Sequence, residues 1–268
     1  MSDRYAVIGN PVAHSKSPWI HAQFARACGQ DLEYVRIEAP LDAFGPTVEA
    51  FRAAGGRGAN VTLPFKQEAF RYCASVSARA REAQAVNTLV LDRGPVWGDN
   101  TDGVGLVRDL EANLGFALQG RRVLVMGAGG AAQGVVPSLH AAGPERLVVA
   151  NRTADRARAL AARFEGATGC GYGELAGAKF DLVVNATSAG LAGELPPLPP
   201  LETLVAPDAL VYDMVYGRDT PFLALAREAG LRASDGAGML VEQAAESFLV
   251  WRGVRPETQA VLASLRRG

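Results

Sequence analysis

The chain has 268 residues, and its 27 Lys and Arg residues nearly balance its 28 Asp and Glu residues, giving a formal net charge of -1. This balance argues against nucleic acid or an anionic membrane surface as the main partner. Hydrophobic residues make up 49% of the chain and charged residues 21%, so it can bury a sizeable core as one large domain or two modest ones.

The N-terminal residues lack the apolar run of a secretory signal, and no stretch of about 18 uninterrupted apolar residues follows. We therefore expect a cytoplasmic protein without a membrane partner. Three widely spaced cysteines, Cys28, Cys73 and Cys170, predict free thiols rather than disulfides or a metal site. The basic residues are 24 Arg and only three Lys (Lys16, Lys66 and Lys179), so a Lys is expected where a proton must be released.

Short β-branched runs alternate with stretches rich in Ala, Leu and Arg, a pattern typical of an α/β protein with a mostly parallel sheet. In the first third, this pattern predicts strands at 5–8, 34–37 and 59–62 and helices at 18–28 and 41–53. A strand at 86–91 and a turn at 92–95 follow. The polar stretch 97–103 is predicted to open a helix that runs to about Leu114.

A second series of elements begins after this helix. It comprises predicted strands at 122–126, 147–150, 181–184 and 210–212, with helices at 130–142 and 153–164. This order is typical of a Rossmann-type dinucleotide-binding domain.

A glycine-rich turn joins the first strand of this series to its helix, with the sequence G-x-G-x-x-A from Gly127 to Ala132. Gly127 would permit the tight turn, and Gly129 would let a pyrophosphate approach the backbone at the helix N-terminus. The alternative is a turn of small residues that binds no ligand.

The end of the next strand lacks the acidic residue that an NAD-binding fold places there. The chain has Asn151, Arg152, Thr153 and Arg156 instead. Two guanidinium groups could hold a 2′-phosphate, with Thr153 donating a hydroxyl and capping the helix, so the cofactor is predicted to be NADP. The alternative is a solvated arginine pair on a surface helix.

Polar residues gather in three segments of the first domain, 10–18, 60–66 and 100–103, each after a strand or strand-like run. Loops beyond the carboxyl ends of strands converge in an α/β fold, so these segments can surround one small polar molecule. Lys66 and Asp102 form a candidate proton-transferring pair. Taken singly, Lys66 could be a surface cation and Asp102 a helix N-cap.

Ordered motifs along nearly the whole chain resemble those of the shikimate dehydrogenase family. They occupy 8–11, 14–18, 60–66, 86–88, 100–103, 127–132, 151–153, 185–190, 213–216 and 236–239, with Gln243 beyond the last. The resemblance implies reversible NADPH-dependent reduction of 3-dehydroshikimate to shikimate, a step of chorismate and aromatic amino-acid biosynthesis. It also implies no metal.

The resemblance assigns roles to individual residues. Ser15 and Ser17 would hold the substrate carboxylate, and the residues implied around the ring hydroxyls are Asn60, Thr62, Lys66, Asn87, Asp102 and Gln243, with Tyr216 also facing the substrate. The dinucleotide would be bound by Gly127, Ala128, Gly129, Gly130, Ala131, Asn151, Arg152, Thr153 and Arg156, with Thr187, Ser188, Met214 and Gly236 lying along it. Lys66, paired with Asp102, would handle the proton.

Because Gln243 lies near the C-terminus, the chain is expected to return to its first domain. The predicted domains are a substrate-binding domain at 1–102, completed by 239–268, and an NADP-binding Rossmann domain at 103–238. One departure from the family pattern is Gln84, where Gly is common. Lys16, between the two serines, could either bind the carboxylate or point outward.

The sequence leaves two other functions open. A quinate or dual quinate/shikimate dehydrogenase would share the fold and the Lys/Asp pair, and a non-catalytic NADP-binding regulator would share the fold alone. The sequence also leaves open whether the chain forms a homodimer.

Overall fold

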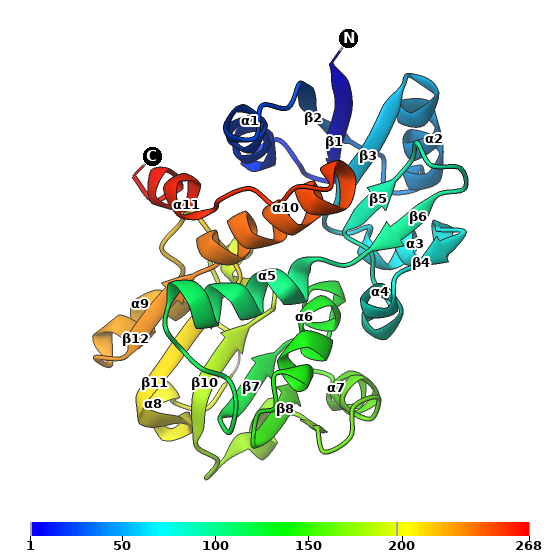
Figure 1. The fold of residues 1–268 in the computed structure, drawn as a ribbon. Coiled ribbons are helices and arrows are strands. Elements are labelled where there is room, and N and C mark those ends of the chain that lie inside the picture. Colours follow the sequence, from blue (N-terminus) through cyan, green and yellow to red (C-terminus); the bar gives the residue numbers. More distant parts are fainter. Residues whose placement is uncertain (1, 197, 268) are drawn as a thin grey trace. The chain divides into compact units, whose positions relative to one another are not determined.

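The computed structural model describes residues 2–196 and 198–267 and divides into two compact units. The first unit combines Met1–Gly105 with Val241–Gly268, and the second is Leu106–Leu240. The first unit is therefore built from two separate segments of the chain, coloured blue to green and red in Figure 1.

The first unit contains a six-stranded sheet in the order β2-β1-β3-β5-β6-β4. Its strands are β1 (Asp3–Gly9), β2 (Leu32–Glu38), β3 (Gly56–Val61), β4 (Ser75–Val76), β5 (Thr88–Val90) and β6 (Trp97–Asp99). Its helices are α1 (Ser17–Ala27), α2 (Phe44–Ala53), α3 (Lys66–Tyr72), α4 (Ala78–Ala83) and α11 (Gln259–Leu265). Two further helices, α5 (Asp102–Arg108) and α10 (Ala237–Arg252), include residues of both units.

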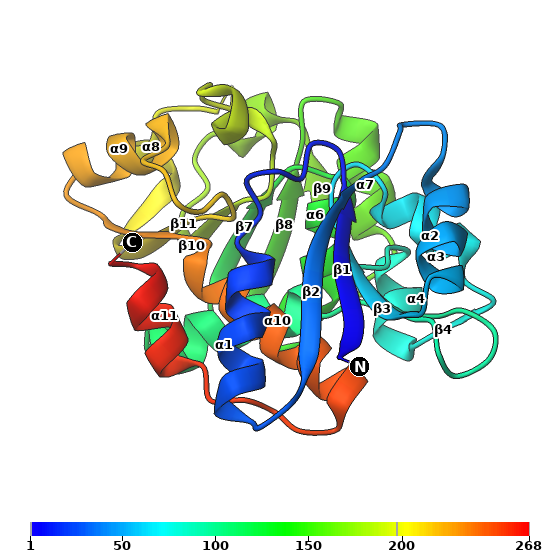
Figure 2. The same cartoon turned by 90° about the horizontal axis from the view of Figure 1, so that it is seen from above.

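Both faces of this sheet are covered by helices. Alternate β1 residues separate the two faces, because Ala6 and Ile8 pack in a cluster with α2 and α3 residues, whereas Tyr5 and Val7 pack with Trp251 of α10. Figure 2 shows α1 and α10 on one side of this sheet and α2 and α3 on the other. The C-terminal segment thus supplies part of the core of the first unit.

The second unit contains a sheet whose strand pairs are all parallel, in the order β12-β11-β10-β7-β8-β9. Its strands are β7 (Arg122–Met126), β8 (Arg146–Ala150), β9 (Thr168–Cys170), β10 (Phe180–Asn185), β11 (Val205–Asp213) and β12 (Arg232–Asp235). Its helices are a π-helical turn (Asp109–Asn113), α6 (Gly130–Ala141), α7 (Ala154–Ala161), 3-10 turns at Tyr172–Leu175 and Ala189–Ala192, α8 (Leu201–Leu204) and α9 (Pro221–Glu228). This is the strand order of a Rossmann fold, as predicted.

Strand residues of the second unit alternate between two apolar clusters. Val123 and Val125 of β7 pack with α6 and α7 residues, whereas Leu124 and Met126 pack with α8 and α9 residues. A parallel sheet buried on both faces explains why these strands are continuous apolar runs in the sequence. The predicted α/β fold class with two domains is confirmed.

Several local predictions were wrong. Within the polar stretch 97–103, Trp97–Asp99 forms β6, which pairs antiparallel with β5. The helix predicted to follow opens at Asp102 and, through a π-helical turn at Asp109–Asn113, does run to about Leu114. Helix α2 begins at Phe44 rather than Leu41. The first sheet is mixed because β5 is antiparallel to both of its neighbours, β3 and β6.

No helix among the described residues combines the length and the apolar character needed to span a membrane.

Candidate active site

Lys66 and Asp102 form an ion pair in the first unit. Lys66 is the first residue of α3, Asp102 is the first residue of α5, and Lys66 Nζ lies 2.6 Å from Asp102 Oδ2. Their side chains are only 14% and 5% exposed. A charge this buried needs a charged or hydrogen-bonding partner. Lys66 is therefore not the surface cation that it could have been when taken singly.

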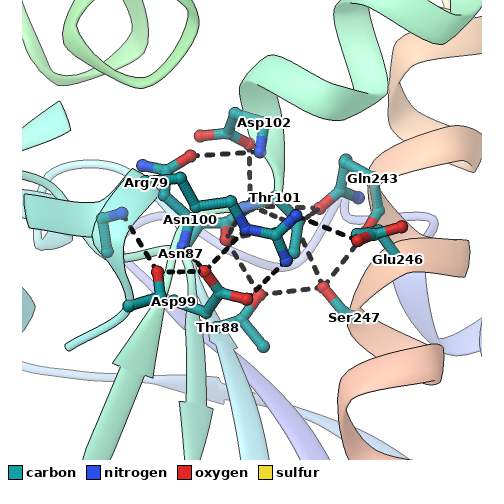
Figure 3. Close-up of polar contacts among 12 residues, drawn as sticks. Arg79, Asn87, Thr88, Asp99, Asn100, Thr101, Asp102, Gln243, Glu246 and Ser247 are labelled. Atoms are coloured by element: carbon teal, nitrogen blue, oxygen red, sulfur yellow. Dashed lines mark hydrogen bonds and ion pairs between the residues drawn. The ribbon is translucent and has the colours of Figure 1, made fainter. Parts of the chain in front are cut away.

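Two asparagines fix the orientation of Asp102. Asn87 Nδ2 donates to Asp102 Oδ1 at 2.8 Å, and Asn100 Oδ1 accepts from the backbone N–H of Asp102 at 3.1 Å (Figure 3). Asp102 is the first residue of α5, so it is not the helix N-cap that the sequence allowed. Both carboxylate oxygens of Asp102 are directed at functional partners, one at Asn87 and the other at Lys66.

Asn87 is itself held by neighbouring groups. Its Oδ1 accepts from the backbone N–H of Thr101 at 2.9 Å and from Thr88 Oγ1 at 2.8 Å. Its Nδ2 also donates to Gln243 Oε1 at 3.3 Å, which brings α10 to the pair (Figure 3). The side-chain amide of Asn87 is thereby locked with its nitrogen facing Asp102.

Asn60 extends the cluster toward β2 and along α10. Its Nδ2 donates to Ser247 Oγ at 2.9 Å and to Thr88 Oγ1 at 3.2 Å, and its Oδ1 accepts from Tyr34 Oη at 2.7 Å. Sequence reasoning missed Ser247 and Tyr34, since a serine in a helix and a tyrosine in a strand carry no local signal. Asn60, Lys66, Asn87, Asp102 and Gln243, which the sequence singled out separately, are joined in the structure.

A second buried charge supports the strand that leads to Asp102. Arg79 donates from Nε and Nη2 to the carboxylate of Asp99 at 2.8 and 2.5 Å, and from Nη1 to Glu246 Oε1 at 2.9 Å (Figure 3). Burial alone would raise the pKa of Asp99, but the hydrogen bonds and charge of Arg79 outweigh it and hold that pKa below its ordinary value. Asp99 therefore stays ionised and accepts the backbone N–H of Asn100 at 2.8 Å.

His21 lies behind Asn60 in the core of the first unit. Its ring stacks on Tyr34, with ring centroids 4.3 Å apart and planes 6° from parallel. Burial lowers the pKa of His21 to about 3, so the ring is neutral at physiological pH.

Ser15 and Ser17 place two buried hydroxyls side by side between β1 and α1. The two Oγ atoms lie 3.2 Å apart, and the side chains are almost inaccessible. Pro18 is in the first turn of α1, as predicted. Lys16 is exposed, so it points outward rather than into the space that Ser15 and Ser17 share.

The other two candidate substrate residues are placed differently. Thr62 follows β3 and is half-buried, and its methyl group packs so closely on Gly9 that a Cβ there would lie 2.3 Å from it. Tyr216 belongs to the second unit, on the loop after β11, and is also half-buried.

The glycine-rich turn in the second unit has the geometry of a dinucleotide loop. Gly127 has φ +106°, and a Cβ there would lie 3.0 Å from the carbonyl oxygen of Ala186, so the turn requires glycine. Gly129 is the N-cap of α6, with open space where its Cβ would be. The free N–H groups of the first turn of this 12-residue helix fit a pyrophosphate. Ala128 and Ala131, like Gly130, are half-buried beside it.

The residues after β8 present an exposed pair of guanidinium groups. Arg152 and Arg156 are exposed and make no ion pair with another described residue. Thr153 is the N-cap residue of α7, but its hydroxyl makes no capping hydrogen bond, so the prediction of side-chain capping was wrong. Asn151 Nδ2 donates to the Thr153 carbonyl at 3.0 Å and shapes the turn.

Two buried side chains, Asn185 and Asp213, hold the loops after β10 and β11, which carry further candidate cofactor residues. Asn185 at the end of β10 accepts from the N–H and hydroxyl of Thr187 at 3.1 and 2.7 Å. Asp213 at the end of β11 accepts from Asn185 Nδ2, from Thr220 Oγ1 and from the N–H of Val215. Sequence reasoning noted both motifs but gave neither residue a role.

Ser188, Met214 and Gly236 lie on the same loops. Ser188 is exposed, and the N–H of Met214 donates to the carbonyl of Asn185 at 3.0 Å. A Cβ on Gly236 would lie 2.4 Å from the carbonyl oxygen of Met214, so only glycine permits this approach. The predicted cofactor residues thus follow the carboxyl ends of β7, β8, β10, β11 and β12. The described residues contain no group of three or more His, Cys, Asp or Glu able to hold a metal ion.

Models of one protein family match three parts of the chain. They are the shikimate dehydrogenase substrate binding domain at residues 7–89, shikimate / quinate 5-dehydrogenase at 110–192, and the shikimate 5′-dehydrogenase C-terminal domain at 236–266. The last match lies largely in the segment that returns to the first unit.

Full-length relatives give the same result. The chain is 58% identical over 271 residues to a shikimate dehydrogenase (NADP(+)) of Dechloromonas aromatica, covering 99% of this chain and 98% of the relative. A solved structure of shikimate 5-dehydrogenase from Thermus thermophilus, in complex with NADP(H) and shikimate, is 37% identical with a TM-score of 0.88 and 99% coverage of both chains. An Ael1 enzyme from Pseudomonas putida is 50% identical with a TM-score of 0.91 and 98% coverage of both chains. The chain belongs to the shikimate dehydrogenase family.

Proposed function

We propose that the protein catalyses the reversible NADPH-dependent reduction of 3-dehydroshikimate to shikimate in the cytoplasm. The observation that carries this function is the buried pair of Lys66 and Asp102 within a cluster of amide and hydroxyl side chains. Asp102 is the one hydrogen-bond partner of Lys66 Nζ among the described residues, so the ammonium has protons left for a further acceptor.

The substrate is a cyclohexene carboxylate with several hydroxyls, and it needs many neutral donors and acceptors. We assign its carboxylate to Ser15 and Ser17, whose adjacent hydroxyls can each donate to one carboxylate oxygen. The residues assigned to its ring hydroxyls and carbonyl are Asn60, Thr62, Lys66, Asn87, Asp102, Tyr216 and Gln243.

Lys66 acts as the general acid in reduction. NADPH, when bound, supplies the hydride that adds to the C3 carbonyl carbon. Lys66 Nζ donates a proton to the carbonyl oxygen as negative charge develops on it, which yields the C3 hydroxyl and a neutral amine. Asp102 orients the ammonium, and Asn87 keeps the carboxylate in place. In shikimate oxidation, the neutral amine accepts the hydroxyl proton.

The cofactor is assigned to the loops at the carboxyl ends of the second sheet. Gly127, Gly129 and the start of α6 fit the pyrophosphate, and exposed Arg152 and Arg156 fit a 2′-phosphate. The loops held by Asn185 and Asp213 carry Thr187, Ser188 and Met214, which we assign to the remainder of the dinucleotide.

Quinate is a second candidate substrate, because the family model that matches residues 110–192 is described as shikimate / quinate 5-dehydrogenase. Quinate has the same carboxylate and offers one more hydroxyl on a saturated ring, so the same donor set could hold it.

The deciding experiment measures initial rates of NADP reduction by the purified protein with shikimate and with quinate, each with NADP and with NAD. We expect the highest kcat/KM with shikimate and NADP. Turnover of quinate at a comparable kcat/KM would support the broader specificity. The absence of turnover with both acids would contradict a catalytic role and favour a regulator that binds NADP without catalysis.

A further inference from the structure

Arg36 contacts the loop that carries both candidate carboxylate-binding serines. It lies on β2, the edge strand of the first sheet, opposite Val7 of β1. Its Nε and Nη2 both donate to the backbone carbonyl oxygen of Ser15, at 2.9 and 2.5 Å. Two donors from one planar guanidinium converge on a single oxygen, which fixes the orientation of the arginine relative to the loop.

The hydroxyls of Ser15 and Ser17 form few hydrogen bonds with the rest of the protein. Ser15 Oγ and Ser17 Oγ are bonded to each other at 3.2 Å, and the N–H of Ser17 donates to Ser15 Oγ at 3.3 Å. A carboxylate could accept from both hydroxyls at once and replace their weak mutual bond with two charge-assisted ones. That arrangement requires the Ser15 backbone to stay where it is.

The loop also carries an electrostatic asymmetry. Lys16 and Arg36 are both exposed residues, but only Arg36 has its charged group bonded to the loop. Arg36 forms no ion pair with a described residue, so no protein carboxylate neutralises its charge there. A positive charge fixed on the backbone of the loop that carries the serine hydroxyls attracts a substrate anion more than a neutral molecule.

We propose that Arg36 is the positioning residue of the carboxylate subsite. By holding the Ser15 carbonyl, it keeps the hydroxyls of Ser15 and Ser17 side by side, where both can donate to one carboxylate. Its charge also favours an anionic group at this subsite. This inference rests on the proposed function. Arg36 touches the loop rather than the reacting atoms, so it should affect the KM for the acid substrate and leave the chemical step alone.

The experiment compares wild type with Arg36→Gln and Arg36→Lys, using shikimate and a neutral analogue whose carboxylate is replaced by a hydroxymethyl group. Arg52→Gln is the matched control, because Arg52 also donates to backbone carbonyls, those of Leu91 and Gly94, at 3.1 and 2.7 Å. The thermal unfolding midpoint of each variant establishes that it is folded.

For Arg36→Gln, we expect the KM for shikimate to rise roughly 3- to 30-fold, while kcat and the KM for NADP change by less than about twofold. Arg36→Lys should recover part of the loss, since it keeps the charge without the paired donors. With Arg36→Gln, the neutral analogue should lose kcat/KM by a clearly smaller factor than shikimate, because it is affected by the loss of loop positioning but carries no charge for the guanidinium to attract.

Three results would overturn the inference while the function stands: an unchanged KM for shikimate in a folded Arg36→Gln, an equal loss for the acid and the neutral analogue, or the same loss in Arg52→Gln. If wild type itself fails to oxidise shikimate, the proposed function is wrong and the inference fails with it.

Discussion

Lysine occupies three positions in this chain, and their surroundings differ sharply. Lys16 and Lys179 are exposed, whereas the side chain of Lys66 is 14% exposed and paired with Asp102. Lys66→Ala should lower kcat by roughly 10²- to 10⁴-fold, because general acid catalysis is lost, and leave NADP affinity nearly unchanged. Steady-state rates and cofactor titration measure both effects, with Lys179→Ala as the control. Near-normal turnover in Lys66→Ala would refute the assignment.

The 2.6 Å contact between Lys66 and Asp102 predicts coupled effects. Asp102→Asn should also lower kcat strongly, since the amide cannot balance the ammonium charge. The double variant should be much less impaired than the product of the two single losses, because the residues act as one unit. A double-mutant cycle in kcat measures this coupling, and fully multiplicative losses would show that the two residues work independently.

Gln84 is the only described residue other than glycine with a positive φ, at 52°. It is the C-cap of α4, a position where the left-handed conformation favours glycine. Gln84→Gly should raise the free energy of unfolding by about 0.5–1 kcal/mol, since relief of backbone strain exceeds the added entropy of the unfolded chain. Urea unfolding measures the change. A destabilised variant would mean that the Gln84 side chain contributes contacts worth more than the strain.

At the scale of elements, we expect the loop after β8 to determine which dinucleotide binds. Arg152→Ala combined with Arg156→Ala should weaken NADP binding by on the order of 10²- to 10³-fold and leave NAD binding nearly unchanged, because NAD lacks the 2′-phosphate. Calorimetric titration with both cofactors measures this. Arg158→Ala is the matched control, since Arg158 is already paired with Glu174 at 3.0 Å. Equal weakening of both cofactors would assign the arginines to the pyrophosphate or to the fold.

The elements that sequence reasoning recovered are those with a strong local pattern. Strand β7 and helix α6 were predicted within a residue or so, because a buried parallel strand is a continuous apolar run and the glycine-rich turn marks the helix start. Strand β6 was missed because Trp97–Asp99 is short and polar in sequence. Its Asp99 is tolerated in the interior chiefly through an ion pair with Arg79, which no local pattern reveals.

The candidate site was predictable to a similar extent. Asn60, Lys66 and Asp102 could be named because each lies in a short polar motif that follows a strand or strand-like run, whereas Asn87 was named through the family resemblance. Their connection through Thr88 and Ser247 could not be predicted, since Ser247 comes from a helix far along the chain and bonds Asn60 at 2.9 Å. Gln243 was assigned only through the family resemblance.

At the scale of the whole molecule, buried His21 makes stability depend on pH. Its pKa is lowered to about 3 by burial, whereas the unfolded ring protonates near its ordinary value of 6.5. Below that value the unfolded state takes up a proton that the folded state does not, so stability falls as pH drops from 6.5 toward 3. At pH 5 the loss should be about 2 kcal/mol relative to neutral pH.

His21→Phe keeps a ring against Tyr34 and removes the titrating group, so its loss of stability from pH 7.5 to pH 5 should be smaller than wild type by about 2 kcal/mol. Urea unfolding followed by tryptophan fluorescence measures it, because Trp19, Trp97 and Trp251 all lie in the unit that contains His21. The lowered pKa of Asp99 reduces stability only near and below its ordinary value of 3.8, so the loss of stability measured at pH 5 separates the effect of His21 from that of Asp99. Equal pH dependence in both proteins would contradict a neutral buried ring.

The two-segment construction of the first unit has a consequence for biosynthesis. Residues 106–240 leave the ribosome after the first segment and before α10, a delay on the order of ten seconds at typical elongation rates. During that interval Tyr5 and Val7 lack the Trp251 ring that covers them, and Asn60 lacks Ser247. The second unit, whose segment is continuous, can complete its sheet first. The nascent first unit thus exposes apolar surface until residues 241–267 emerge to complete its core.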